Sequence, residues 1–279
     1  MRSTYALLLI IFTLNLFSCK KEHVSSNKPS TIPPDVPIKH VLLKDITIPR
    51  LPSPYYHFEY NSDSLVTKAD FASGFTIYDV FYSGNKIREM RNNILVNHDT
   101  LRYVYDNTGK LALIKFINDA NVIYRHASFI YNGAQIKEIE WDRKDGNAGF
   151  IIDRTLTFTL YPDSNVKTIT DHRPSLNGAA EYNSIMTFEQ YDDKINVDDF
   201  GLIHDGIHDH LFLLQGFRLQ KGNPKKERLS VNGVDLYTND YTYTYNSDNT
   251  PSTKIGDFLY ISGPSAGQRF QTNSIYTYY

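Results

Sequence analysis

Residues 101–116 read LRYVYDNTGKLALIKF, and this stretch decides the fold. Side chains alternate with a period of two before the polar turn at residues 106–109, and they do so again after it. A period of two on both sides of an Asp/Asn/Gly turn is a strong short-range signal for a β-hairpin. The alternating sets are Leu101, Tyr103 and Tyr105 against Arg102 and Val104, then Leu111, Leu113 and Lys115 against Ala112, Ile114 and Phe116.

The same unit, a tyrosine followed by a tight polar turn, recurs along the chain. Successive tyrosines lie 22, 23, 26, 30, 30 and 54 residues apart, which is the spacing of one hairpin reused with lengthening excursions. The repeat therefore predicts about seven hairpins. The tyrosines are Tyr60, Tyr82, Tyr105, Tyr131, Tyr161, Tyr191 and Tyr245.

Short turns leave no room for crossover helices, so consecutive strands are expected to pair antiparallel as a meander. One face of each predicted strand is apolar and the other carries Thr, Lys, Glu and Asp, so a flat sheet would leave its apolar side in water. We therefore predict an all-β domain over residues 55–279, curled into a barrel-like or strongly coiled sheet. A short helical insertion is expected near residues 204–217, and residues 38–48 are apolar enough to form a first strand.

At these units the chain resembles two groups of proteins. The tyrosine, turn and apolar pattern is similar to the YD repeat of Rhs-type and teneurin-type shells, although the regular Gly and Arg positions are missing. Residues 55–279 also resemble the uncharacterised surface lipoprotein domains of Gram-negative bacteria that have a porin-like β fold. In that family, segments similar to 191–196 and 221–226 flank a helical insertion and lead into a final Tyr-rich hairpin. The resemblance implies a β fold and assigns no catalytic residue.

The N-terminus has the pattern of an export signal. Arg2 supplies a positive charge, and the apolar run that follows is too short to span a bilayer comfortably. Its end, Leu16-Phe17-Ser18-Cys19, resembles the lipobox of bacterial lipoproteins. We therefore predict a signal peptide over residues 1–18 and lipid attachment at Cys19. An ordinary secretory signal is the alternative.

Residues 19–54 are expected to form a tether, because they hold seven of the 12 prolines and proline disfavours helix. Lys20 stands where lipoprotein families carry the aspartate that implies retention at the inner membrane. This favours anchoring to the outer membrane, with either a periplasmic or an outward-facing domain.

Composition excludes several classes of partner and site. The chain has 29 Lys and Arg against 31 Asp and Glu, so there is no strong electrostatic footprint for nucleic acid. Cys19 is the single cysteine, which excludes an internal disulfide. No phosphate-loop or dinucleotide motif is present, and no cofactor is expected. Residues 263–267, Gly-Pro-Ser-Ala-Gly, have the spacing of a nucleophile elbow, but no histidine follows them and a turn is expected.

Two clusters are candidate sites. His204, His208 and His210 lie in one short segment, and a helix there would place His204 and His208 on one face, as zinc sites require. Gly206 argues against that helix, and an adventitious loop is the alternative. The pairs Asp192-Asp193 and Asp198-Asp199 are interpreted as solvated turn residues, because adjacent side chains in a strand point to opposite faces.

The leading functional hypothesis is a lipid-anchored, non-enzymatic binding or scaffold module for a glycan or protein ligand. Tyrosines on a rigid sheet suit either ligand. One alternative is a metal-dependent hydrolase that uses the cluster from His204 to His210. The other is a membrane-spanning barrel, suggested by the aromatic C-terminal segment 270–279. The sequence leaves the oligomeric state open.

Overall fold

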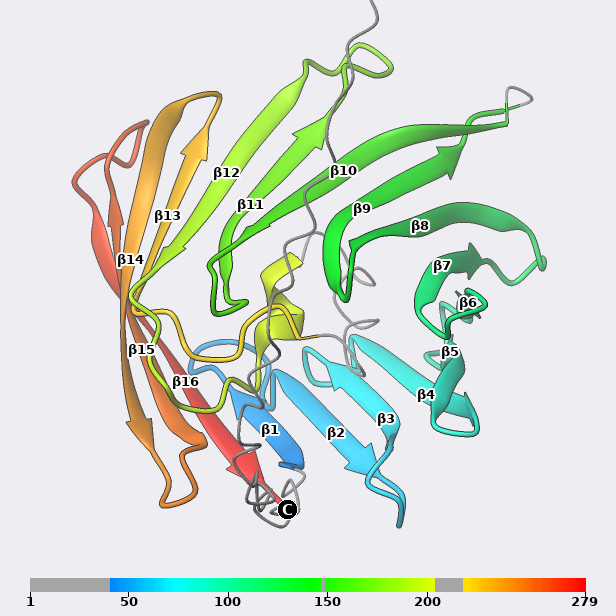
Figure 1. Cartoon of the computed structure of the whole chain (residues 1–279), viewed down its shortest axis with the longest axis horizontal. Coiled ribbons are helices and arrows are strands. Elements are labelled where there is room, and N and C mark those ends of the chain that lie inside the picture. Colours follow the sequence, from blue (N-terminus) through cyan, green and yellow to red (C-terminus); the bar gives the residue numbers. More distant parts are fainter. Residues whose placement is uncertain (1–40, 147–148, 204–217) are drawn as a thin grey trace, which may run out of the picture. The chain divides into compact units, whose positions relative to one another are not determined.

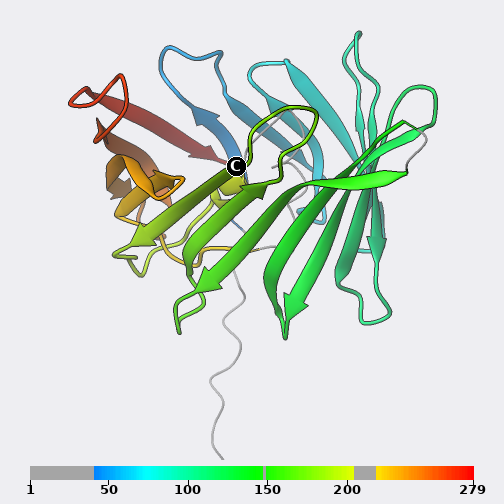
Figure 2. The same ribbon diagram turned by 90° about the horizontal axis from the view of Figure 1, so that it is seen from above.

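The chain forms a closed antiparallel β-barrel of sixteen strands in a computed structural model that describes residues 41–146, 149–203 and 218–279. Each strand pairs with its neighbours in sequence, and β1 pairs with β16 to close the ring. Figure 1 shows the ring of strands, and Figure 2 shows their inclination from a second side. The predicted all-β meander is confirmed, with sixteen strands rather than about fourteen.

The first seven strands have five to eight residues, and six of the later strands have ten to twelve. Their bounds are β1 (Leu43–Thr47), β2 (Tyr56–Tyr60), β3 (Val66–Phe71), β4 (Thr76–Ser83), β5 (Lys86–Asn92), β6 (Thr100–Tyr105), β7 (Leu111–Ile117), β8 (Ile123–Asn132), β9 (Gln135–Lys144), β10 (Phe150–Leu160), β11 (Val166–Arg173), β12 (Tyr182–Glu189), β13 (Lys226–Val231), β14 (Val234–Tyr245), β15 (Pro251–Tyr260) and β16 (Arg269–Tyr278).

The first and last strands of the barrel pair with each other and close it. Leu43 of β1 lies opposite Tyr278 of β16, and the Tyr279 hydroxyl donates to the Phe58 carbonyl over 3.0 Å. β1 lies within residues 38–48, so the predicted first strand is confirmed. The sheet thus begins inside residues 19–54, which are expected from the sequence to form the tether. Closure leaves no long open edge for another chain to pair with.

A β-bulge follows the tyrosine turns and explains where the period-two pattern slips. In the third unit Tyr105 pairs with Leu111 and Val104 pairs with Leu113, so Ala112 is the extra residue. Leu111 therefore shares the inner face with Ile114 and Phe116, which are buried, and not with Leu113 as simple alternation predicts. Bulges bend the strand and increase its twist, which a closing sheet requires.

The repeated tyrosine links one hairpin to the preceding one. The Tyr105 hydroxyl donates to the Ile87 carbonyl over 2.8 Å, and Ile87 lies opposite Tyr82, the tyrosine of the preceding unit. Burial raises the pKa of Tyr105 to about 12, so the hydroxyl keeps its proton at neutral pH. The same donation occurs from Tyr60 to Leu43, Tyr82 to Val66, Tyr131 to Leu111, Tyr191 to Val166 and Tyr278 to Pro251.

The two faces of the sheet differ sharply in polarity. On β9, Ile139 and Trp141 point inward and are 0% exposed, while Glu138 and Glu140 alternate with them and point outward. The buried apolar residues form one cluster inside the barrel, and its members come from β1–β12, from β16 and from the long β12–β13 connection. The prediction that the apolar face points to a shared interior is therefore confirmed.

The long connection between β12 and β13 enters the barrel. We call its described parts, residues 190–203 and 218–225, the plug. The plug contains one 3-10 turn, η1 (Asp199–Ile203), which lies inside the ring of strands in Figure 1. The Phe200 ring packs edge-on against Tyr56 and Phe58, with centroid distances of 5.2 and 5.5 Å. The predicted helical insertion at 204–217 lies outside the described residues. In the described ranges no helix has the length and apolar character needed to cross a membrane.

Candidate functional site

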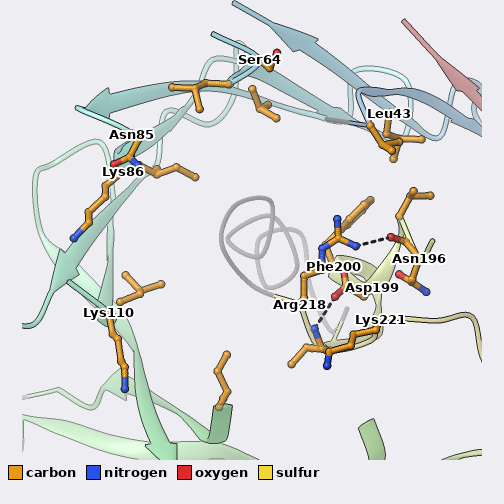
Figure 3. A pocket seen from close by; sticks show the side chains of 18 of the residues that line it. Leu43, Ser64, Asn85, Lys86, Lys110, Asn196, Asp199, Phe200, Arg218 and Lys221 are labelled. Atoms are coloured by element: carbon orange, nitrogen blue, oxygen red, sulfur yellow. Dashed lines mark hydrogen bonds between the residues drawn. The ribbon is translucent and has the colours of Figure 1, made fainter. Parts of the chain in front are cut away.

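The barrel interior contains a cavity of about 990 Å³ at the end where the tyrosine turns gather. Its floor is apolar, and its rim is made of turn residues from successive hairpins, so each of the first five repeats contributes one segment of the wall. Figure 3 shows the cavity between the sheet and the plug. The floor includes Leu43, Phe58, Ile87, Leu111 and Ile136, and the rim includes Ser64, Asn85, Lys86, Lys110 and Ser164.

Tyrosine rings and lysines alternate along the rim. The Lys86 ammonium lies 5.0 Å from the centre of the Tyr105 ring, and the Lys110 ammonium lies 5.2 Å from the centre of the Tyr131 ring. Each lysine thus reaches from its own hairpin to the tyrosine of the next one. Cation–π contacts of this kind hold the ammonium groups in fixed positions around the opening.

The plug forms the opposite wall. It places Arg218 and Lys221 on the cavity, where the Arg218 guanidinium donates to the Asn196 carbonyl over 3.1 Å. Together with Lys86 and Lys110 they give four basic groups, and the acidic groups of the described lining are Asp63 and Asp199. The cavity therefore has a net positive lining.

Amide and carboxylate groups fix the plug to the barrel wall. Asn165, in a β10–β11 turn, accepts hydrogen bonds from the backbone N–H groups of Lys221 and Gly222 at 2.7 and 3.1 Å. The Asp192 carboxylate accepts from the Asn223 backbone at 2.9 Å and from the Tyr245 hydroxyl. Because these partners are far apart in sequence, they define one position for the plug.

Asp199 sits where the plug meets the cavity. Its carboxylate accepts hydrogen bonds from the backbone N–H groups of Leu219, at 2.7 Å, and Gln220, at 3.4 Å. Burial raises the pKa of Asp199 to about 6, and its neighbour Asp198 adds to this effect, while the two N–H donors and Arg218 oppose it. Asp199 therefore loses its proton close to neutral pH.

We expect Asp199→Asn to remove a pH dependence of stability. In the unfolded chain this group ionises near pH 3.8, and in the folded chain near pH 6. The unfolded state thus loses its proton first, so raising the pH from about 4 to about 6 weakens folding. The loss is about 3 kcal/mol and persists above pH 6. Urea denaturation at pH 4 and pH 7 measures it.

Between pH 4 and pH 7, the free energy of unfolding of Asp199→Asn should fall by about 3 kcal/mol less than that of the native chain. Asp193→Asn is the control, because its side chain is 90% exposed on the same segment. Equal pH dependence in Asp199→Asn and the native chain would contradict the assignment.

The interpretation of both Asp-Asp pairs as solvated turn residues is wrong for three of the four. Asp193 is exposed, but Asp192 and Asp199 hold the plug. Asp198 accepts from the Tyr276 hydroxyl at 2.6 Å and from the Lys254 ammonium at 3.3 Å. These carboxylates anchor a loop inside the barrel, where water no longer satisfies them and protein donors do.

The other predicted sites divide between described and undescribed parts. Cys19, His204, His208 and His210 lie outside the described residues. Within the part that is described, no three His, Cys, Asp or Glu side chains form a group that could hold a metal ion. Residues 263–267 form a turn, as predicted, in which the Ala266 N–H donates to the Gly263 carbonyl over 3.1 Å.

Among the charged cavity residues, the sequence singled out Asp199 as part of an Asp-Asp pair, but it did not single out Lys86, Lys110 or Arg218. Lys86 and Lys110 each stand directly before the first apolar residue after a tyrosine turn, and this shared position was the available signal. Arg218 offered none, since only the start of the plug, at Tyr191, belongs to the repeat.

Comparison with solved structures supports the barrel fold. No family model matches the chain, and neither does any curated protein. Among solved structures, a porin-like protein from Bacteroides uniformis is similar with a TM-score of 0.56 and 15% identity. That match covers 80% of this chain and 89% of the other. A TcdB2-TccC3 complex without its hypervariable C-terminal region gives a TM-score of 0.30 at 10% identity, covering 80% of this chain and 13% of that chain. The chain thus has a porin-like β-barrel fold.

Proposed function

We propose that this protein is a lipid-anchored lipoprotein of the outer membrane whose barrel stays outside the bilayer and binds glycans without catalysis. The lipid on Cys19 holds it to the membrane, and the proline-rich segment that follows spaces the barrel from the surface. The cavity supplies what a sugar chain needs, which is tyrosine rings beside neutral amides, hydroxyls and fixed lysines.

The observation that carries the proposal is the polarity of the outer face. A barrel that spans a membrane needs an outward apolar band, and a lysine or arginine at the bilayer midplane costs about 2–4 kcal/mol. Here three neighbouring strands carry charge outward: Arg91 on β5, Arg102 on β6 and Lys115 on β7, and Arg102 lies directly opposite Lys115. On β9, Glu138 and Glu140 face outward as well.

Glu89 shows that this outer charge is organised rather than scattered. Although it lies on the outer face, it is only 5% exposed, because Arg88, Arg91 and Arg102 surround its carboxylate. Such a cluster is stable beside water and would be costly against lipid tails. This favours a barrel in water over the spanning alternative.

The first experiment separates these locations. We expect a chain without residues 1–19 to appear in the soluble fraction of lysed cells and to remain in solution without detergent. Metabolic labelling with palmitate should mark the full chain and not Cys19→Ser. Precipitation of the truncated chain unless detergent is present would contradict the position outside the bilayer, and an unlabelled full chain would contradict the anchor.

The second experiment addresses the ligand. A glycan array probed with the Cys19→Ser chain is expected to retain it on sugars. Lys110→Ala should weaken that retention by removing one of the fixed rim cations. Lys137→Ala is the matched control, because Lys137 is an exposed bulge residue of β9 that does not line the cavity. Retention on no glycan would count against glycan binding and would leave a protein ligand to be sought by pull-down.

A further inference from the structure

The inner face of β14, β15 and β16 carries a group of aromatic rings that the cavity does not use. We call Tyr237, Phe258, Tyr260 and Phe270 the aromatic platform. Phe258 and Phe270 lie directly opposite each other on paired strands and stack with a centroid distance of 4.6 Å and an interplanar angle of 21°. Tyr237 and Tyr260 form the next paired position, and both rings contact Phe258, at 4.2 and 4.9 Å.

The platform is open to solvent on one side. Phe270 is 45% exposed although its neighbours in the stack are partly buried. A large aromatic surface exposed to water is unfavourable, and in soluble proteins such a surface commonly marks a binding site for a ligand or partner. The rings sit on three consecutive paired strands, so their geometry is rigid before any ligand arrives.

Polar groups lie beside the rings. Asn239 pairs directly with Phe258, is 6% exposed, and its Oδ1 has no hydrogen-bond partner among the described residues. Gly256 leaves room for the Asn239 side chain, since a Cβ at Gly256 would lie 2.7 Å from that oxygen and 2.6 Å from the Thr272 hydroxyl. A buried acceptor without a donor costs about 1–3 kcal/mol. The acceptor is therefore suited to a donor brought by a ligand.

The charge beside the platform selects against anions. The Glu227 carboxylate accepts hydrogen bonds from the Tyr237 hydroxyl at 2.8 Å and the Tyr241 hydroxyl at 2.6 Å. A phosphate, sulfate or carboxylate placed on the rings would meet this negative charge at close range. A neutral molecule with hydroxyl donors would not.

We propose that the aromatic platform binds a neutral pyranose ring, with the apolar face of the sugar on Phe270 and a sugar hydroxyl donating to Asn239. A pyranose has one face of C–H groups and a rim of hydroxyls, which matches flat rings beside an unpaired amide oxygen. None of the four platform residues lines the cavity. The platform is thus a second sugar contact, and it goes beyond the glycan binding proposed for the cavity.

The test is calorimetric titration of the Cys19→Ser chain with chitohexaose, laminarihexaose and maltohexaose. We expect at least one of these neutral oligosaccharides to bind, and Phe270→Ala to weaken that binding at least tenfold. Gln271→Ala is the matched control, since Gln271 is the next residue of β16, is exposed and points to the outer face; it should bind within twofold of the parent chain.

Two further variants keep the result interpretable. Phe270→Leu retains apolar volume but loses the flat ring, so it should lose binding as Phe270→Ala does while the thermal midpoint stays near that of the parent. Asn239→Ala should also weaken binding. Full binding by Phe270→Leu or by Phe270→Ala, or no heat with any of the three sugars, would overturn the platform. Binding that is lost in Lys110→Ala and intact in Phe270→Ala would overturn it while supporting the cavity.

Discussion

Gly222→Ala is expected to destabilise the fold by about 3 kcal/mol or more, because the new methyl group has no space. A Cβ at this position would lie 2.1 Å from the backbone oxygen of Asp192, which is far inside van der Waals contact. The obstruction is backbone, so no side-chain rotation relieves it. The plug must move away from Asp192, and the Asn223 N–H then loses its 2.9 Å hydrogen bond to that residue's carboxylate. Urea denaturation measures the loss.

Gly201→Ala provides the control for this prediction. Gly201 lies in the same plug, and a Cβ there meets nothing within 4 Å. Its replacement should change the free energy of unfolding by no more than about 0.5 kcal/mol. If both alanine variants were equally stable, the plug would not be held against Asp192 as described.

Phe200→Ala is expected to cost about 3–5 kcal/mol by leaving a hole between the plug and the barrel wall. Phe200 is 5% exposed, and its ring lies edge-on against Tyr56 and Phe58. Phe75→Ala removes the same side chain at a site that is 58% exposed, and it should cost less than about 1 kcal/mol. Chemical denaturation measures the free energy of unfolding of both variants. Equal losses would show that the Phe200 contacts contribute nothing to stability.

The repeat was predictable because its causes are local. A tyrosine, an Asx turn and an apolar residue lie within a few positions, and the turn hydrogen bonds stay inside the unit, as when the Asp106 carboxylate accepts from the Thr108 and Lys110 N–H groups. The bulge at Ala112 was not predicted, because alternation assigns side chains to the inner or outer face correctly only where the strand has no extra residue. A single insertion then moves every later side chain to the other face.

The anchoring of the plug inside the barrel was not predictable, for a different physical reason. Its anchors join residues far apart in sequence, such as Asp192 with Tyr245 and Asn165 with Lys221. Contacts of this kind leave no periodic pattern in the sequence. The carboxylates and amides that hold the plug are therefore indistinguishable, from the sequence, from solvated loop residues. The same limit applies to the platform, since Phe258 and Phe270 meet only through the pairing of β15 with β16.

The pairing of β1 with β16 also sets the order in which the molecule can be completed. A chain that emerges from a translocation pore with its N-terminal end first presents β1 before any other strand, yet one of the two partners of β1 is the last strand to arrive. Until then, β1 and β15 each expose a row of unsatisfied amides and carbonyls, and another copy can attach there. Deleting the final ten residues would therefore have a large effect for so short a segment, because the edges of β1 and β15 would both remain unpaired in the folded protein.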